Sequence, residues 1–275
     1  MRRVAVALAA ASLLGLAGCD GAVGAEMTFD DTEKSKITDI VLAGGSADVM
    51  ITTGAGTETR IKRVVRGATD PGRSYQISGA VLTLSSECGR DCHVSYEIQA
   101  PAGVAVRGDL RSGDVGLNRV GPVDLKMTSG DVFVENATGA VAIKGTSGDI
   151  TIDGAPSVNL EMTSGDVNAR GVTGAVNSRT GSGDTYLELT AAASVTASVT
   201  SGDLHVVVPA GSYQVRTDTG SGDEVVERGV VVDPKAKNTL DLRTRSGDLT
   251  VTTTPSGPAP ERPEAPPAPD RPTPG

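Results

Sequence analysis

Apolar and polar residues alternate along most of the chain between residues 37 and 254. A period of two is typical of β-strands that bury one face, because successive side chains of a strand point to opposite sides. Downstream of residue 100, the pattern predicts repeats of a strand, a loop of variable length, a second strand and a tight turn. We therefore expect an all-β chain. The strands predicted upstream cover residues 37–43, 49–53, 59–65, 81–84 and 94–98.

The tight turn is a Ser-Gly-Asp triplet that occurs eight times. Successive copies lie 17, 18, 17, 18, 19, 20 and 25 residues apart, and aliphatic residues recur at the same offsets around most of them. Such a period is the signature of a stacked repeat architecture. The triplets begin at Ser112, Ser129, Ser147, Ser164, Ser182, Ser201, Ser221 and Ser246.

Two architectures fit this repeat: a meander of antiparallel hairpins, and a β-solenoid in which each strand pairs with its equivalent in the next repeat. The solenoid is favoured because like residues at equivalent positions would then stack directly. We predict a β-helix-like stack of 17–20-residue coils over residues 101–254. An N-terminal β cap is predicted over residues 37–100, with a degenerate copy of the turn at 46–48. The longer segment 224–245 leaves regular stacking there open.

The composition agrees with thin coils. The chain has 35 Gly, no Trp, two Phe and four Tyr, so its core must be built from Val, Ile, Leu and Ala. This disfavours a large barrel or doubly wound enzyme, whose core would use several large rings. The net charge of −9 argues against a nucleic-acid partner, which would require a basic face.

The first residues predict export. A basic start and a short apolar run are typical of a signal peptide over residues 1–18. Leu-Ala-Gly-Cys at 16–19 resembles the lipobox of bacterial lipoproteins, which implies acylation of Cys19 and a lipid anchor in the membrane. The alternative is an ordinary signal peptide with a chance cysteine. Residues 19–36 are expected to be a tether, and the proline-rich residues 255–275 a disordered tail. The expected location is the outer face of the cytoplasmic membrane, in the cell envelope.

Cys88 and Cys92 lie in a polar loop between two alternating runs. Because exported chains meet oxidising conditions, we predict a disulfide that closes the base of a hairpin. The alternative is a metal site formed by both cysteines and His93, which lacks a fourth ligand nearby.

The aspartates of the turns would align along one edge of a solenoid, one coil apart. Like charges at such spacing repel, so solvent, backbone N–H groups or bound cations must relieve the repulsion. Calcium prefers several oxygen ligands, and one carboxylate per coil is sparse for it, so local turn chemistry is the favoured explanation and a weak cation ladder the alternative. The residues concerned are Asp114, Asp131, Asp149, Asp166, Asp184 and Asp203.

No catalytic motif is present, and we expect neither an enzyme nor a cofactor. The two histidines of the chain, His93 and His205, are not tied to a nucleophile by any motif. For a carbohydrate-acting β-helix enzyme, the acidic residues to check are Asp153 and Glu188, which lie outside the turns. The Arg-Gly-Asp tripeptide at 107–109 falls in a predicted strand and is attributed to chance.

The repeated Ser-Gly-Asp-[Val/Ile]-x-[Leu/Val], the loop cysteines and the segment 94–103 together resemble a bacterial β-strand-repeat family of unknown function. That family is similar to adhesin head domains built as β-solenoids, and the resemblance covers residues 37–254. It implies a surface-displayed, non-catalytic, adhesin-like lipoprotein with an unidentified envelope partner. No catalytic residue is implied. The alternatives are an accessory or sensory lipoprotein of a membrane system and, less favoured, a carbohydrate-acting β-helix enzyme.

Overall fold

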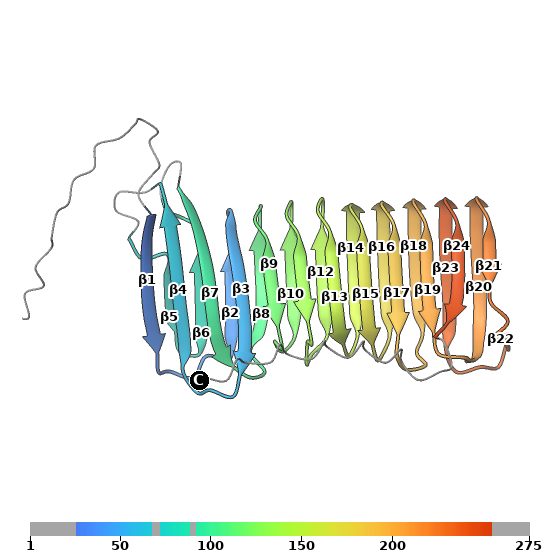
Figure 1. The fold of residues 1–275 in the computed structure, drawn as a ribbon, viewed down its shortest axis with the longest axis horizontal. Coiled ribbons are helices and arrows are strands. Elements are labelled where there is room, and N and C mark those ends of the chain that lie inside the picture. The colour runs from blue at the N-terminus through green and yellow to red at the C-terminus, as the bar shows by residue number, and fades with distance from the viewer. Residues whose placement is uncertain (1–25, 68–71, 89–91, 255–275) are drawn as a thin grey trace, which may run out of the picture.

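The computed structural model describes residues 26–67, 72–88 and 92–254. These residues form two sheets of twelve strands each, which lie face to face in an elongated stack (Figure 1). In spatial order, sheet A contains β1 (Glu26–Glu33), β4 (Thr59–Arg66), β7 (His93–Pro101), β3 (Ala47–Gly54), β9 (Val115–Asn118), β11 (Val132–Glu135), β13 (Ile150–Ala155), β15 (Val167–Val172), β17 (Thr185–Leu189), β19 (Leu204–Val208), β24 (Leu249–Thr253) and β21 (Glu224–Val226).

Sheet B faces sheet A across the core. Its strands, in spatial order, are β22 (Val230–Val232), β20 (Gly211–Ser221), β23 (Thr239–Ser246), β18 (Val195–Ser201), β16 (Val176–Ser182), β14 (Val158–Ser164), β12 (Val141–Gly145), β10 (Val123–Met127), β8 (Ala105–Leu110), β2 (Asp39–Ala43), β6 (Val81–Ser85) and β5 (Tyr75–Ser78).

Equivalent strands of successive repeats pair in parallel, which confirms the solenoid. In sheet B, for example, Val123 lies beside Val141, which lies beside Val158. Each coil crosses from sheet B to sheet A through the Ser-Gly-Asp corner and returns through the variable loop. Antiparallel pairing occurs at the N-terminal end, where β1 pairs with β4, β4 with β7, and β5 with β6.

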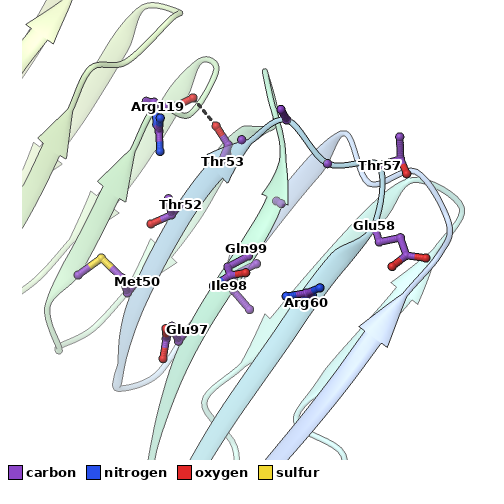
Figure 2. A pocket seen from close by; sticks show the side chains of 14 residues that line it. Met50, Thr52, Thr53, Thr57, Glu58, Arg60, Glu97, Ile98, Gln99 and Arg119 are labelled. Carbon is purple, nitrogen blue, oxygen red and sulfur yellow. Dashed lines mark hydrogen bonds between the residues drawn. The ribbon is translucent and has the colours of Figure 1, made fainter.

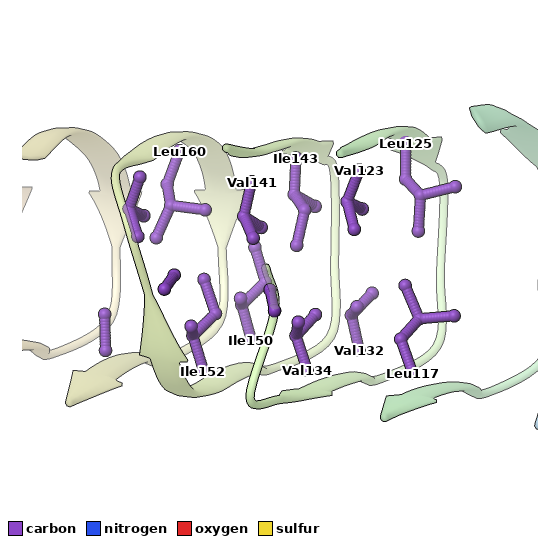
Figure 3. Packing of buried hydrophobic residues seen from close by; sticks show 14 of the residues in the cluster. Leu117, Val123, Leu125, Val132, Val134, Val141, Ile143, Ile150, Ile152 and Leu160 are labelled. Carbon is purple, nitrogen blue, oxygen red and sulfur yellow. The ribbon is translucent and has the colours of Figure 1, made fainter. Parts of the chain in front are cut away.

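The core is a double column of aliphatic side chains between the sheets. Branched side chains from neighbouring coils stack on one another, and each buried one contributes roughly 1.5–3 kcal/mol. The buried tyrosines, Tyr96 on β7 and Tyr213 on β20, lie towards the two ends of the rod. In the middle of the rod, Leu125, Ile143 and Leu160 of sheet B face Leu117, Val134 and Ile152 of sheet A (Figure 3).

The chain does not stack its coils in sequence order at either end. The first coil, β2–β3, lies between β6–β7 and β8–β9. The last coil, β23–β24, lies between β18–β19 and β20–β21. Residues 46–48, predicted as a degenerate copy of the turn, form a corner inside the stack between β2 and β3, whereas β1 and β4–β7 lie at the N-terminal end of the rod.

The predicted tether over residues 19–36 is wrong for residues 26–33, which form β1. This acidic strand pairs with the basic strand β4, and Glu26 accepts a hydrogen bond from Arg66 at 2.9 Å. On the core side, the guanidinium of the buried Arg63 lies 4.2 Å from the centre of the Phe29 ring. Charge complementarity between the two strands thus decides a pairing that the weak alternation of residues 26–33 did not predict. The predicted signal peptide, Cys19 and the proline-rich tail lie outside the described residues.

The C-terminal end of the rod carries polar groups where the other coils carry aliphatic ones. Glu224 is in register with the fully buried Leu249 but is exposed, and it accepts a hydrogen bond from Thr217 at 2.6 Å. The short strand β22 and the loop before β23 lie beside this coil. An inward-pointing charge at a sheet edge opposes pairing with another chain.

Candidate functional site

The Ser-Gly-Asp corners form a ladder of carboxylates linked by hydrogen bonds. In each corner, Oδ1 of the aspartate accepts a hydrogen bond from the backbone N–H of the aspartate in the next coil, at 2.8–3.1 Å. In spatial order the ladder contains Asp48, Asp114, Asp131, Asp149, Asp166, Asp184, Asp203, Asp248 and Asp223. The structure thus brings together the six predicted aspartates and adds three more.

Glycine is required at the middle of these corners. Gly165, for instance, has a φ of +119°, and a Cβ added there would overlap the carbonyl oxygen of Gly148 in the preceding corner. Both the backbone conformation and the close approach exclude larger residues. Ala47 occupies this position in the corner of β2–β3, because the coil outside it has no Ser-Gly-Asp corner to pack against.

The ladder stabilises the stack through backbone contacts. Its Oδ1 atoms bind N–H groups, and within the described residues no cluster of three or more His, Cys, Asp or Glu side chains is arranged to hold a metal ion. At the N-terminal end of the ladder, Oδ2 of Asp48 lies 2.9 Å from Nε2 of His93. The corners therefore stabilise the contact between neighbouring coils. The candidate ligand-binding residues lie on the faces of the sheets.

A disulfide joins Cys88 and Cys92, whose Cα atoms are 5.8 Å apart. It lies between β6 of sheet B and β7 of sheet A, which are not hydrogen-bonded to each other. The expectation of a hairpin base is therefore wrong: the loop takes the place of a Ser-Gly-Asp corner in a coil that lacks one.

The outer faces of the two sheets differ in chemistry. On sheet A, one row of outward side chains crosses every strand from β3 to β21 in register, and we call it the outer row. Among the described residues there are five exposed large hydrophobic side chains, and three of them, Met50, Phe133 and Val225, belong to this row. The outer row consists of Met50, Gly116, Phe133, Thr151, Asn168, Tyr186, His205, Thr250 and Val225.

The corresponding row on sheet B carries no aromatic ring. It is mostly polar, and it includes Arg107, whereas Asp109 belongs to the next row along β8, in register with Ala43 and Lys126. The Arg-Gly-Asp tripeptide thus lies within β8, in the middle of a paired strand, with Gly108 packed against the backbone of Leu42. The row consists of Val41, Arg107, Asp124, Ala142, Asn159, Asn177, Thr196, Asp241 and Arg216.

A groove of about 480 Å³ lies at the N-terminal end of the outer row (Figure 2). Its floor comes from strands β3 and β7, with Thr52 and Gln99 in register, and the loop between β3 and β4 rises beside it. Arg60 and Arg119 lie on opposite sides of this floor (Figure 2). Thr53 donates a hydrogen bond to the carbonyl oxygen of Arg119 at 2.5 Å, which ties the corner after β9 to β3.

The groove continues into an apolar platform. The Met50 side chain lies over Gly116, since a Cβ added at this glycine would collide with the Met50 sulfur. Phe133 follows Gly116 in register on the next strand and is 48 % exposed. Because Gly116 carries no side chain, the Met50 side chain lies across it towards the strand of Phe133, and the two apolar side chains are neighbours on this face.

Further along the outer row, Tyr186 is enclosed by polar neighbours. Its ring contacts His205 edge to face at 5.2 Å, and the Arg170 guanidinium lies 5.0 Å from its centre. Burial, together with the hydrogen bond to Glu188 at 3.1 Å, raises the pKa of Tyr186. Asp153 is in register with Arg170 on the same face. The two acidic residues singled out from the sequence therefore share one exposed face with Arg170 between their strands.

The side chains around Tyr186 provide hydrogen-bonding and charged groups that can bind a ligand. The nearest partner of His205 besides Tyr186 is Thr252, whose hydroxyl lies 3.1 Å from Nε2. The sequence analysis did not find the outer row or its groove. A signal existed, because Phe133 and Tyr186 both stand two residues after the aspartate of a corner.

Within the described residues, the structure contains no helix that is long and apolar enough to cross a membrane. No curated protein matches the chain. A solved structure from Bacteroides fragilis NCTC 9343, described as "a putative adhesin", is similar with a TM-score of 0.50 and 15% identity, over 83% of this chain and 97% of that one. Another so described, from Parabacteroides distasonis ATCC 8503, has a TM-score of 0.45 and 13% identity, over 84% and 98%.

At these identities the likeness concerns the fold alone. The sequence match is more specific, since the profile of the family named Toastrack DUF4097 matches residues 104–252. This range contains all eight Ser-Gly-Asp corners and most of the solenoid. The resemblance to a β-strand-repeat family of unknown function is confirmed, and the chain belongs to the Toastrack DUF4097 family.

Proposed function

We propose that this chain is a non-catalytic, adhesin-like binding lipoprotein of the cell envelope. In this proposal Cys19 carries the lipid anchor on the outer face of the cytoplasmic membrane, and the solenoid presents its sheet A face to a partner. The observation that carries the proposal is the unequal chemistry of the two faces. Met50 and Phe133 lie on the two strands that flank β9, and neighbouring exposed apolar side chains are typical of interaction sites, whereas scattered ones are ordinary.

The architecture supports this role. Parallel pairing on both sides of each inner coil holds the outward side chains at fixed spacing along the rod, which suits recognition by an extended surface. The Bacteroides fragilis neighbour, described as a putative adhesin, shares the fold and supports the same class of function by analogy. The polar surroundings of Tyr186, His205 and Glu188 on an open face favour binding over catalysis, since catalytic groups work in sites that exclude water.

Binding can be tested with envelope fragments of the source organism. The full chain, immobilised through an added C-terminal tag, is expected to retain them, and the double variant Met50→Ser/Phe133→Ser is expected to lose most of this retention. Val231→Ser is the matched control, because Val231 is as exposed as Met50 but lies off the outer row. Equal retention by both variants would remove the support that the outer row gives to the proposal.

The anchor needs a separate test. Cys19→Ser is expected to move the chain from the membrane fraction to the soluble fraction and to abolish labelling with radioactive palmitate. Continued labelling of this variant would show that Cys19 is not the lipidated residue.

A further inference from the structure

We infer that the groove and platform at the N-terminal end of the outer row bind a neutral polysaccharide chain. This inference rests on the proposed binding function and names its ligand class. The site is defined by Met50, Gly116 and Phe133 as platform, and by Thr52 and Gln99 as polar floor.

The platform supplies the first element of sugar recognition. A pyranose ring presents a face of C–H groups, and this face packs against flat apolar or aromatic surfaces. Phe133 is exposed, and the Met50 side chain, which lies over Gly116 on the neighbouring strand, extends the apolar surface beside it. Phe133 and Tyr186 are the aromatic side chains on this face, and Tyr186 is already flanked by Arg170 and His205. Phe133 is therefore the ring available for stacking.

The groove supplies hydrogen-bonding groups beside the platform. Gln99 and Thr52 each offer both a donor and an acceptor, as sugar hydroxyls require. At the other border, the Asn118 amide donates to Glu135 at 2.6 Å, so this pair forms a fixed polar edge in register with Thr52. The apolar surface is thus surrounded by hydrogen-bond donors and acceptors. This arrangement matches a sugar, which carries hydroxyl groups at its rim and is apolar on its faces.

Charge decides between neutral and anionic sugars. The groove is lined by two guanidinium groups, Arg60 and Arg119, and two carboxylates, Glu58 and Glu97. Glu97 also pairs with Lys62 at 3.0 Å. The charges are therefore close to balanced, and the whole chain carries −9, which repels polyanions. A neutral ligand avoids both the desolvation of an unpaired charge and this long-range repulsion.

Shape favours a chain over a single sugar. Met50 belongs both to the lining of the groove and to the outer row, which continues from it in register across the remaining strands. With strands about 4.8 Å apart, Phe133 and Tyr186 are separated by roughly 14 Å along the rod. An extended polysaccharide lying along the rod can contact the platform and continue over this polar part of the row.

The inference can be tested by biolayer interferometry with the full chain in a detergent that contains no sugar. The probes are the neutral polysaccharides dextran, mannan, laminarin and galactan, with hyaluronate as the anionic comparison. We expect at least one neutral polysaccharide to bind. Phe133→Ser should weaken this binding about ten-fold, Phe133→Tyr should retain it, and Val231→Ser should leave it unchanged. Binding of none of the neutral probes, a preference for hyaluronate, or indifference to Phe133→Ser would overturn the inference.

A second arm separates this inference from the proposed function. Envelope fragments are treated with periodate, which cleaves the vicinal diols of sugars, or with protease, which removes proteins. Binding that survives protease and is lost after periodate supports the polysaccharide. Binding that survives periodate and is lost after protease refutes the polysaccharide and leaves the binding function intact. If untreated fragments do not bind either, both proposals fail.

Discussion

The aspartate ladder allows hydrogen bonding and charge to be separated at a single residue. Asp166 lies near the middle of the ladder: its N–H donates to Asp149, and its carboxylate accepts from the N–H of Asp184, both at 2.8 Å. A hydrogen bond to a charged group contributes about 1.5–3 kcal/mol, and the lower value applies to an exposed corner. The two neighbouring carboxylates oppose this gain.

The repulsion follows from the coil spacing. Two unit charges about 4.8 Å apart in water repel by ~0.9 kcal/mol, and physiological salt roughly halves this figure. The two neighbours of Asp166 together therefore cost it about 1 kcal/mol. Asp166→Asn keeps an acceptor oxygen and removes the charge, so its free energy of unfolding should stay within about 0.5 kcal/mol of the parent. Asp166→Ala loses the hydrogen bond of about 1.5 kcal/mol and relieves the repulsion of about 1 kcal/mol, so we expect a net loss of about 0.5 kcal/mol.

Urea unfolding of the three proteins measures these differences, as shifts of the midpoint at constant m-value. Asp124→Asn, an exposed substitution on the outer face of sheet B, serves as the control for a charge removed outside the ladder. In 1 M salt the repulsion is screened, so the alanine variant should fall further below the parent. Calcium and a chelator should leave the midpoint of the parent unchanged, because backbone N–H groups already bind the Oδ1 atoms. The reasoning is refuted if the asparagine variant loses as much stability as the alanine variant.

Three further predictions concern the corners, the rod end and a tyrosine. Gly165→Ala should lower the free energy of unfolding by about 3 kcal/mol, because the new Cβ meets both a positive φ and an overlap with the backbone of the preceding corner. Gly54→Ala is the control and should be nearly neutral, because a Cβ there meets nothing within 4 Å. Equal midpoints of thermal unfolding for the two variants would contradict the corner geometry. Glu224→Val should remove the charge that protects the C-terminal edge, so light scattering should detect concentration-dependent association, and a monomer at all concentrations would argue against this protection. Burial and then the hydrogen bond to Asp31 raise the pKa of Tyr75 to about 12. Its contribution to stability should therefore be complete below pH 10 and be lost as the pH rises towards 12; absorbance at 295 nm should show this late ionisation, and Tyr75→Phe should remove it.

The alternation of residues and the Ser-Gly-Asp repeat were enough to predict an all-β solenoid. Both signals are local: a strand with one buried face must alternate, and a corner that packs on its neighbour needs glycine at one position. The outward positions carry no such constraint, since any side chain that tolerates water fits there. Phe133 and Tyr186 therefore stood out only after parallel stacking had placed them in one row.

The sequence pattern did not predict the contacts between segments that are far apart in the chain. Apart from the coil of β20–β21, which carries Glu224 at a core position, the coils share the same aliphatic columns. The offsets around their corners therefore do not distinguish a coil that stacks in sequence order from one inserted between two others. The positions of β2–β3 and β23–β24 depend on which coil ends are best covered, and that is a property of the assembled stack. The same holds for β1, whose pairing with β4 depends on opposite charges that the chain brings together only on folding.

What the amino-acid sequence determined by itself is thus the repeating unit, with its buried columns and its glycine corners, because these follow from rules that act within one coil. The tertiary structure alone decided the order of the coils at both ends, the place of the disulfide at a corner, and the groove beside Phe133. Each of these depends on side chains that meet across coils. The period of the repeat does not specify which coils become neighbours, because most coils share the same pattern.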